Sequence, residues 1–123
     1  MDFTFRKQEK LKHKKLIEIL FSEGKSISVF PLRIVFLEND HDGNKLLQVG
    51  FSVPKRLIKK AVDRNRIKRQ LREVYRLNKK EFYKSIDKKY IMMVVFMDDK
   101  KYDSSILNTK MINIFDKFIK SIS

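Results

Sequence analysis

The chain has 123 residues, with 29 Lys or Arg against 15 Asp or Glu, and its formal net charge is +14. That length suits one domain, residues 1–123, and a hydrophobic content of 42% is enough for one modest core. The absence of cysteine excludes disulfides and thiolate metal sites. No apolar run reaches the ~20 residues of a membrane span, and the N-terminal residues lack the apolar segment of a secretory signal. We therefore expect a single cytoplasmic domain that binds a polyanion and no membrane.

Hydrophobic periodicity predicts an α+β protein. Apolar residues recur every three or four positions in the expected helices and every second position in the expected half-buried strands. The expected elements are a helix over 12–22, strands over 28–37 and 46–53, a helix over 64–80, a buried strand over 90–97 and a helix from Ser104 or Ser105. Gly24 stands where a helix C-terminal cap belongs, and Pro31 favours an edge position or a strand start. We expect the helices to pack on one small sheet.

Positive charge is concentrated in residues 55–80, which hold twelve Lys or Arg and only two acidic residues, Asp63 and Glu73. When residues 64–80 are placed on a helix, one face is mainly apolar and the opposite face is cationic. The first face comprises Ile67, Leu71, Val74, Tyr75 and Asn78, and the second comprises Asn65, Lys68, Arg69, Arg72, Arg76 and Lys79, with Arg64 and Arg66 on the flanks. Either Asp63 caps this helix, or the helix begins earlier and another element covers Ile58, Ala61 and Val62.

This cationic face favours nucleic-acid binding over a merely solvated surface. A solvated helix normally mixes charges to form i,i+4 pairs, whereas like charges on one face cost stability unless a partner neutralises them. Arginine is frequent in the segment, and its planar fork binds phosphates in a bidentate manner.

Side chains suited to catalysis or metal binding are few. His13 and His41 are the only histidines, and neither has a companion at the spacing of a metal site or a triad. Asp98 and Asp99 could hold Mg²⁺, but an acidic pair after a strand is more often a turn. We therefore expect no catalytic residue in the polypeptide.

Four phenylalanines are candidates for stacking on unpaired bases: Phe21, Phe30, Phe36 and Phe51. A core position is the favoured interpretation for Phe51 and Phe30. Phe21 and Phe36 would line a cleft if the first helix lies over one edge of the sheet.

Residues 58–72, IKKAVDRNRIKRQLR, resemble the Arg-Asn-Arg motif of the bacterial ribonuclease P protein subunit family. Residues 49–56, VGFSVPKR, resemble the segment that precedes this motif in the family. Phe5 with Lys10 and Leu11, and Phe21 with Gly24, resemble its N-terminal part. The resemblance implies a two-layer α/β sandwich of order αβββαβα, with a four-stranded sheet. It also implies a left-handed βαβ crossover through the basic helix, against the usual rule.

The resemblance further implies the protein subunit of ribonuclease P, a ribonucleoprotein endoribonuclease that removes the 5′ leader from precursor tRNA. Its RNA subunit would carry the Mg²⁺-dependent hydrolysis, and its partners would be that RNA and precursor tRNA, with no DNA. Contacts to the RNA subunit would come from Lys55, Arg56, Arg64, Asn65, Arg66, Lys68, Arg69, Arg72 and Arg76, with Mg²⁺ near Asn65. A cleft between the first helix and the sheet would hold the single-stranded leader, lined by Ile17, Phe21, Ile34 and Phe36.

Two other hypotheses stay open at this point. A general binder of structured RNA, such as a ribosomal protein, would bind unrelated RNAs equally well. A self-sufficient nuclease would depend on His13, His41 or the pair Asp98 and Asp99.

Overall fold

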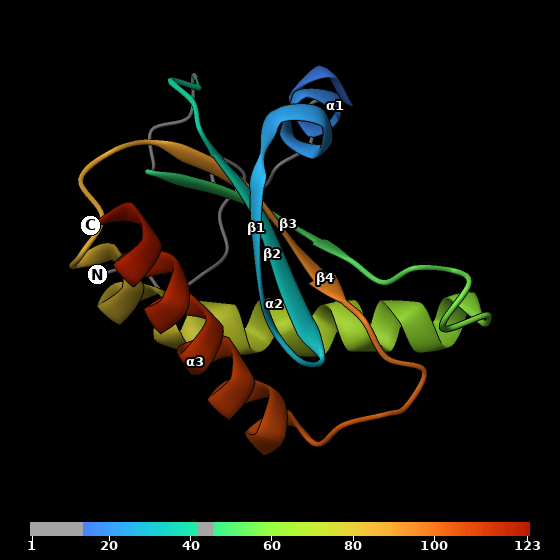
Figure 1. Cartoon of the computed structure of the whole chain (residues 1–123). Coiled ribbons are helices and arrows are strands. Elements are labelled where there is room, and N and C mark those ends of the chain that lie inside the picture. The colour runs from blue at the N-terminus through green and yellow to red at the C-terminus, as the bar shows by residue number, and fades with distance from the viewer. Residues whose placement is uncertain (1–13, 42–45) are drawn as a thin grey trace.

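The computed structural model describes residues 14–41 and 46–123, which form three helices around a four-stranded sheet (Figure 1). The elements are α1 (Lys14–Glu23), β1 (Lys25–Val29), β2 (Leu32–Glu38), β3 (Leu47–Ser52), α2 (Ala61–Tyr83), β4 (Tyr90–Phe96) and α3 (Ser104–Ile122). The strand order is β1-β2-β4-β3, with β2 antiparallel to β1 and β4, and β3 parallel to β4. The αβββαβα order and the α/β sandwich are confirmed.

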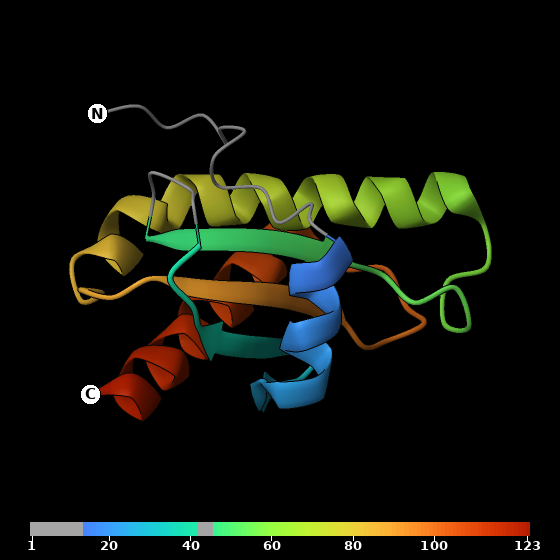
Figure 2. The same cartoon turned by 90° about the horizontal axis from the view of Figure 1, so that it is seen from above.

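The connection from β3 through α2 to β4 is left-handed. β3 and β4 are parallel neighbours, and α2 lies on the side of the sheet away from α1 (Figures 1 and 2). Seen from the α1 side in Figure 2, both strands run to the right, and the chain returns behind the sheet to the strand below β3. This hand opposes the rule for almost all such units, as the resemblance implies.

The sheet separates two layers of apolar side chains. On one face, α2 and α3 cover the main core, which includes Ile34 and Phe36 of β2. On the other face, Leu20 of α1 packs with Val35 and with the alternate residues of β4. All seven residues of β4 are buried, which explains its unbroken apolar sequence. Among the helices of residues 14–41 and 46–123, none combines the length and apolar composition needed to cross a bilayer.

The single strand expected over 28–37 is two strands in the structure. β1 and β2 form a hairpin whose turn contains the cis peptide between Phe30 and Pro31. Proline has no N–H to donate to a ladder, so it stands at the turn rather than within a strand. Phe30 is 63% exposed at this turn, and the interpretation of Phe30 as a core residue is wrong.

Gly24 is explained by close packing. Its N–H donates to the carbonyl of Leu20 at 2.8 Å, which continues the helical pattern, and its φ is not positive. An added Cβ would overlap the carbonyl oxygen of Leu20 and lie 3.0 Å from that of Phe36. Gly24 directly follows the last residue of α1, as its predicted place at the helix end requires, and the absence of a side chain lets β2 approach closely there.

α2 begins two residues before Asp63, so the alternative of an earlier start is correct and Asp63 does not cap the helix. The N-cap is Lys60, whose side chain makes no capping hydrogen bond. Asp63 lies in the first turn, where the helix dipole favours a carboxylate, and its Oδ1 is 3.6 Å from Nζ of Lys101. Ile58 is buried, but Val62 is 76% exposed, so only part of the preceding apolar sequence is covered.

Candidate nucleic-acid interface

The outer side of α2 carries the cationic face that the sequence predicts. The inner side is buried against the sheet and α3 through Ile67, Leu71, Val74, Tyr75 and Phe82. Five polar residues on the other side define what we call the α2 cationic face: Asn65, Arg66, Lys68, Arg69 and Arg72. All are exposed except Lys68, which is half-buried. Helical periodicity produces this division because the core fixes one side of α2 and leaves the opposite side in water.

The centre of the α2 cationic face is not neutralised by the protein's own acids. Neither Arg69 nor Arg72 forms an ion pair with a carboxylate in the part of the chain that the structure describes. Unpaired guanidinium groups at neighbouring positions on one helix face repel one another in the free protein. A polyanion would relieve this repulsion, so the face is suited to phosphates.

Arg76 differs from these residues because it already has an acidic partner. Its guanidinium donates to both carboxylate oxygens of Glu73, with Nη2 2.5 Å from Oε1 and Nε 3.1 Å from Oε2. These hydrogen bonds hold the pKa of Glu73 below its usual value and raise the pKa of Arg76. A phosphate would have to compete with Glu73 for Arg76.

Lys79 is not part of the exposed surface, and the prediction that places it there is wrong. Its side chain is 5% exposed. Lys79 follows Asn78, whose amide donates to the backbone of Val74 and to Asn108 of α3 at 2.6 Å. Burial closes the position of Lys79 to a partner, whereas the next residue, Lys80, stays exposed.

Basic residues also surround the N-terminal end of α2. Lys55 and Arg56 are exposed in the turn that follows β3. Arg64 is half-buried, and its Nη1 donates to the carbonyls of Ile58 and Lys59 at 3.0 and 2.7 Å. Arg64 thus differs from the exposed arginines of α2, because the protein's own backbone occupies part of its guanidinium.

Only some of the residues predicted to line the leader cleft lie on the same side of the sheet. Ile17 is half-buried and Phe21 is 52% exposed on α1. Ile34 and Phe36 point to the opposite face of the sheet, where the ring of Phe36 packs against Phe118 at a centroid distance of 4.9 Å. The placement of Ile34 and Phe36 in this cleft is therefore wrong. Strand alternation puts them on one face together but does not tell which helix layer covers that face.

Strand register identifies the residues that do lie on the α1 face. Met93 of β4 pairs with Val35 of β2 and with Gly50 of β3. The next such row includes Arg33 and Ser52 on either side of β4. Side-chain alternation already places Gly50 and Ser52 on the face opposite the apolar residues of their strand, so the sequence could predict that these two residues share a face. The sequence could not predict that Arg33 lies on the same face of the sheet, because that depends on the pairing of the strands.

Aromatic packing shows that Phe51 belongs to the core. It is half-buried and meets the ring of Tyr75 edge-on at 5.9 Å between centroids, so its interpretation as a core residue is confirmed.

The candidate catalytic residues have structural roles or lie outside the described residues, as His13 does. His41 is 3% exposed, with Nε2 3.3 Å from the carbonyl oxygen of Leu46. The Asp98 carboxylate accepts hydrogen bonds from the Tyr102 hydroxyl and the Asp99 N–H, which makes this pair a turn. The bond to Asp98 raises the pKa of Tyr102 to about 12.

The donor atoms near the α2 cationic face do not form a magnesium site by themselves. Mg²⁺ prefers carboxylate and other oxygen ligands in octahedral geometry. Asn65 supplies one amide oxygen among positive charges, and within residues 14–41 and 46–123 no group of three or more acidic or histidine residues is arranged to hold a metal ion. Any Mg²⁺ near Asn65 would need most of its ligands from a partner.

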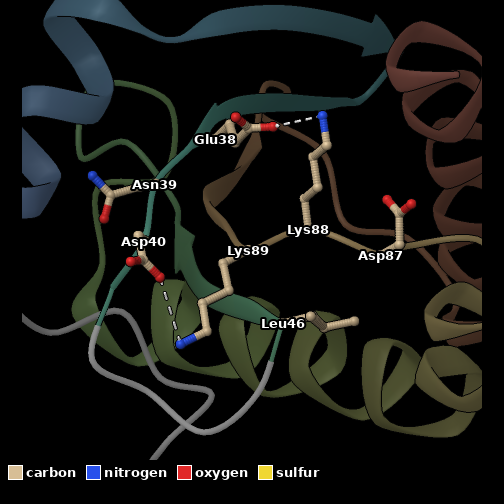
Figure 3. Close-up of a pocket in the computed structure, with 7 residues that line it drawn as sticks. All are labelled: Glu38, Asn39, Asp40, Leu46, Asp87, Lys88 and Lys89. Carbon is tan, nitrogen blue, oxygen red and sulfur yellow. Dashed lines mark ion pairs between the residues drawn. The ribbon is translucent and has the colours of Figure 1, made fainter.

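A cavity of about 420 Å³, lined mainly by charged residues, lies near the start of β4, away from the N-terminal end of α2 (Figures 2 and 3). Two ion pairs cross it, Lys88 with Glu38 at 3.5 Å and Lys89 with Asp40 at 3.8 Å. Because its lysines face acids, this cavity lacks the unbalanced charge of the α2 cationic face.

Comparison with known proteins agrees with this geometry. The profile of the family described as Ribonuclease P matches residues 5–119. The Ribonuclease P protein component of Porphyromonas gingivalis is 40% identical over 77 residues, which span 63% of this chain and 56% of that protein. The RNase P protein from Thermotoga maritima superposes with a TM-score of 0.71 at 25% identity, covering 89% of this chain and 96% of that one. The fold is shared with the Staphylococcus aureus RNase P protein, which superposes with a TM-score of 0.68 at 20% identity, covering 88% of this chain and 93% of that one. With its αβββαβα sandwich, its cationic α2 and a family match over almost the whole length, the chain belongs to the Ribonuclease P family.

Proposed function

We propose that the chain is the protein subunit of ribonuclease P. In this role it assists an RNA subunit in the endonucleolytic removal of the 5′ leader from precursor tRNA. The observation that carries the proposal is the α2 cationic face, whose central arginines have no acidic partner in the described part of the chain. The family match supports an RNA partner for this face, since the relatives are named as protein components of ribonuclease P.

The α2 cationic face would bind the phosphate backbone of the RNA subunit. Phosphate contacts supply affinity and fix orientation but carry little sequence information. That property suits a protein that must hold one folded RNA in register. Lys55 and Arg56 extend the charged surface beyond the N-terminal end of α2, and Arg76 contributes only where phosphate displaces Glu73.

The unpaired leader would lie on the α1 side of the sheet. Phe21 offers an exposed ring for base stacking, with Ile17 beside it. Gly50 and Ser52 lie on the same sheet face, and both have little or no side-chain bulk. A protein that holds both the RNA subunit and the leader prefers precursor to mature tRNA, because only the precursor offers the second contact.

The hydrolysis itself would belong to the RNA subunit and its Mg²⁺. His41 is buried and the Asp98 carboxylate is engaged by Tyr102, so neither is placed to act on a phosphodiester. The polypeptide binds and orients the RNA in the cytoplasm.

A cleavage assay tests this proposal. Purified protein is added to its cognate RNA subunit at low Mg²⁺, and precursor tRNAs with leaders of increasing length are followed. We expect stimulation that grows with leader length and then levels off. Equal stimulation for all leaders, with equal binding of unrelated RNAs, would indicate a general RNA binder. Cleavage by the protein alone would indicate a nuclease, and no stimulation would refute the proposed function.

A further inference from the structure

We propose that Arg64 is a positioning residue. It fixes the shape of the basic segment 55–60, which precedes α2, and is not one of the phosphate ligands of the α2 cationic face. The RNA-binding part of this inference rests on the proposed function. Its structural part concerns the protein alone.

The first observation is the geometry of the guanidinium. Nη1 of Arg64 lies 3.0 Å from the carbonyl oxygen of Ile58 and 2.7 Å from that of Lys59. Both carbonyls belong to the chain just before the N-cap, Lys60. The backbone N–H of Arg64 also donates to the carbonyl of Lys60 at 3.0 Å. One residue therefore ties three successive carbonyls to the first turn of α2.

The second observation is how little else holds the end of the segment. At its start, the N–H groups of Leu57 and Ile58 both donate to the carbonyl of Pro54 at 3.1 Å. Ile58 is anchored in the core with 7% exposure. At the end of the segment, the carbonyls of Ile58 and Lys59 accept their hydrogen bonds from the side chain of Arg64. Loss of Arg64 would release that end of the segment.

The third observation is the charge that the segment presents. Lys55, Arg56, Lys59 and Lys60 are all exposed. Four cations within six residues repel one another, so without the hydrogen bonds of Arg64 the segment would become more extended. Because these cations are already held in place before RNA binds, less conformational entropy is lost on binding. Arg64 thus affects RNA affinity through the positions of the exposed lysines and arginine of segment 55–60.

Arg69 gives the contrast. It is exposed and has no hydrogen-bond or acidic partner in the part of the chain that the structure describes. Arg69 can turn to a phosphate at no cost in internal bonds, whereas Arg64 would have to give up two.

Hydrogen exchange in the free protein tests the structural part. In Arg64→Ala, release of the Ile58 carbonyl should let the adjoining turn at Pro54 open more often, so the amides of Leu57 and Ile58 should exchange about tenfold faster. Arg69→Ala should leave both amides at the wild-type rate. Arg64→Lys, which keeps the charge and can donate to one carbonyl, should recover part of the protection. If Arg64→Ala does not fold, the exchange rates of the same two amides are compared between Arg64→Lys and the wild type.

The salt dependence of binding to the RNA subunit tests the second part. Arg64→Ala should weaken binding several-fold with little change in the log–log slope, whereas Arg69→Ala should flatten it by about 0.7–0.9. Wild-type exchange in both Arg64 variants, or a slope flattened as much as in Arg69→Ala, would overturn the inference. Failure to stimulate cleavage would refute the proposed function and leave the exchange result standing.

Discussion

The most direct test of the α2 cationic face is the double variant Arg69→Ala with Arg72→Ala. The two residues are three positions apart, a rise of about 4.5 Å along a helix. Both are exposed, so neither substitution leaves a cavity or an unpaired buried group. We therefore expect a change in RNA affinity with little change in the stability of the fold.

The magnitude follows from counterion release. Each lost phosphate contact flattens the log–log dependence of affinity on salt by about 0.7–0.9. Two contacts give a change of about 1.4–1.8 in the slope. Between 50 and 200 mM salt, the advantage of the wild type over the double variant should shrink by about tenfold.

The assay is equilibrium binding to the ribonuclease P RNA over a salt series, with constant Mg²⁺. Lys120→Ala is a matched control, since Lys120 is an exposed cation on α3. Thermal unfolding of each variant checks that the fold is retained.

An unchanged slope in the double variant would show that Arg69 and Arg72 do not meet phosphates. An equal flattening per removed charge in Lys120→Ala would show that total charge, rather than the α2 cationic face, controls binding. Either result would refute the reasoning.

Three further predictions concern other parts of the molecule. Gly24→Ala should lower the free energy of unfolding by about 1–3 kcal/mol in urea titrations, because the new Cβ overlaps the carbonyl of Leu20. Tyr102→Phe should destabilise the protein at neutral pH. The hydroxyl of Tyr102 lowers the pKa of Asp98 below 3.8, so the difference from wild type should fade as acid protonates the carboxylate, and an undiminished difference would contradict this. Phe21→Ala should weaken binding of precursor tRNA but not of mature tRNA, and equal loss for both would argue against leader stacking.

The sequence determined the type of most elements and the exposed part of the binding surface. Helical periodicity in residues 64–80 is strong, because core contacts select one side of α2 along several turns. Asn65, Arg69 and Arg72 lie opposite that side and are exposed as predicted. Likewise, the unbroken apolar run after Lys89 could be satisfied only by a strand covered on both faces.

Local pattern was insufficient where two layers compete for the same strand. Alternation grouped Ile34 with Phe36, but either face of β2 is apolar enough to meet a helix. Only the tertiary structure decided that α2 and α3 cover this pair and that α1 covers Val35. The division of 28–37 into two strands was hidden for a similar reason, since side-chain alternation continues through the turn at Pro31.

Charge alone also did not separate the roles of the basic residues on α2. Lys79, Arg64 and Arg69 look alike in sequence, yet one is buried, one is bonded to the preceding backbone and one is open to solvent. Composition and periodicity fix how many cations one side of a helix carries. Which of them a partner can reach depends on the chain segments that pack beside that helix, and these are brought there by contacts distant in sequence.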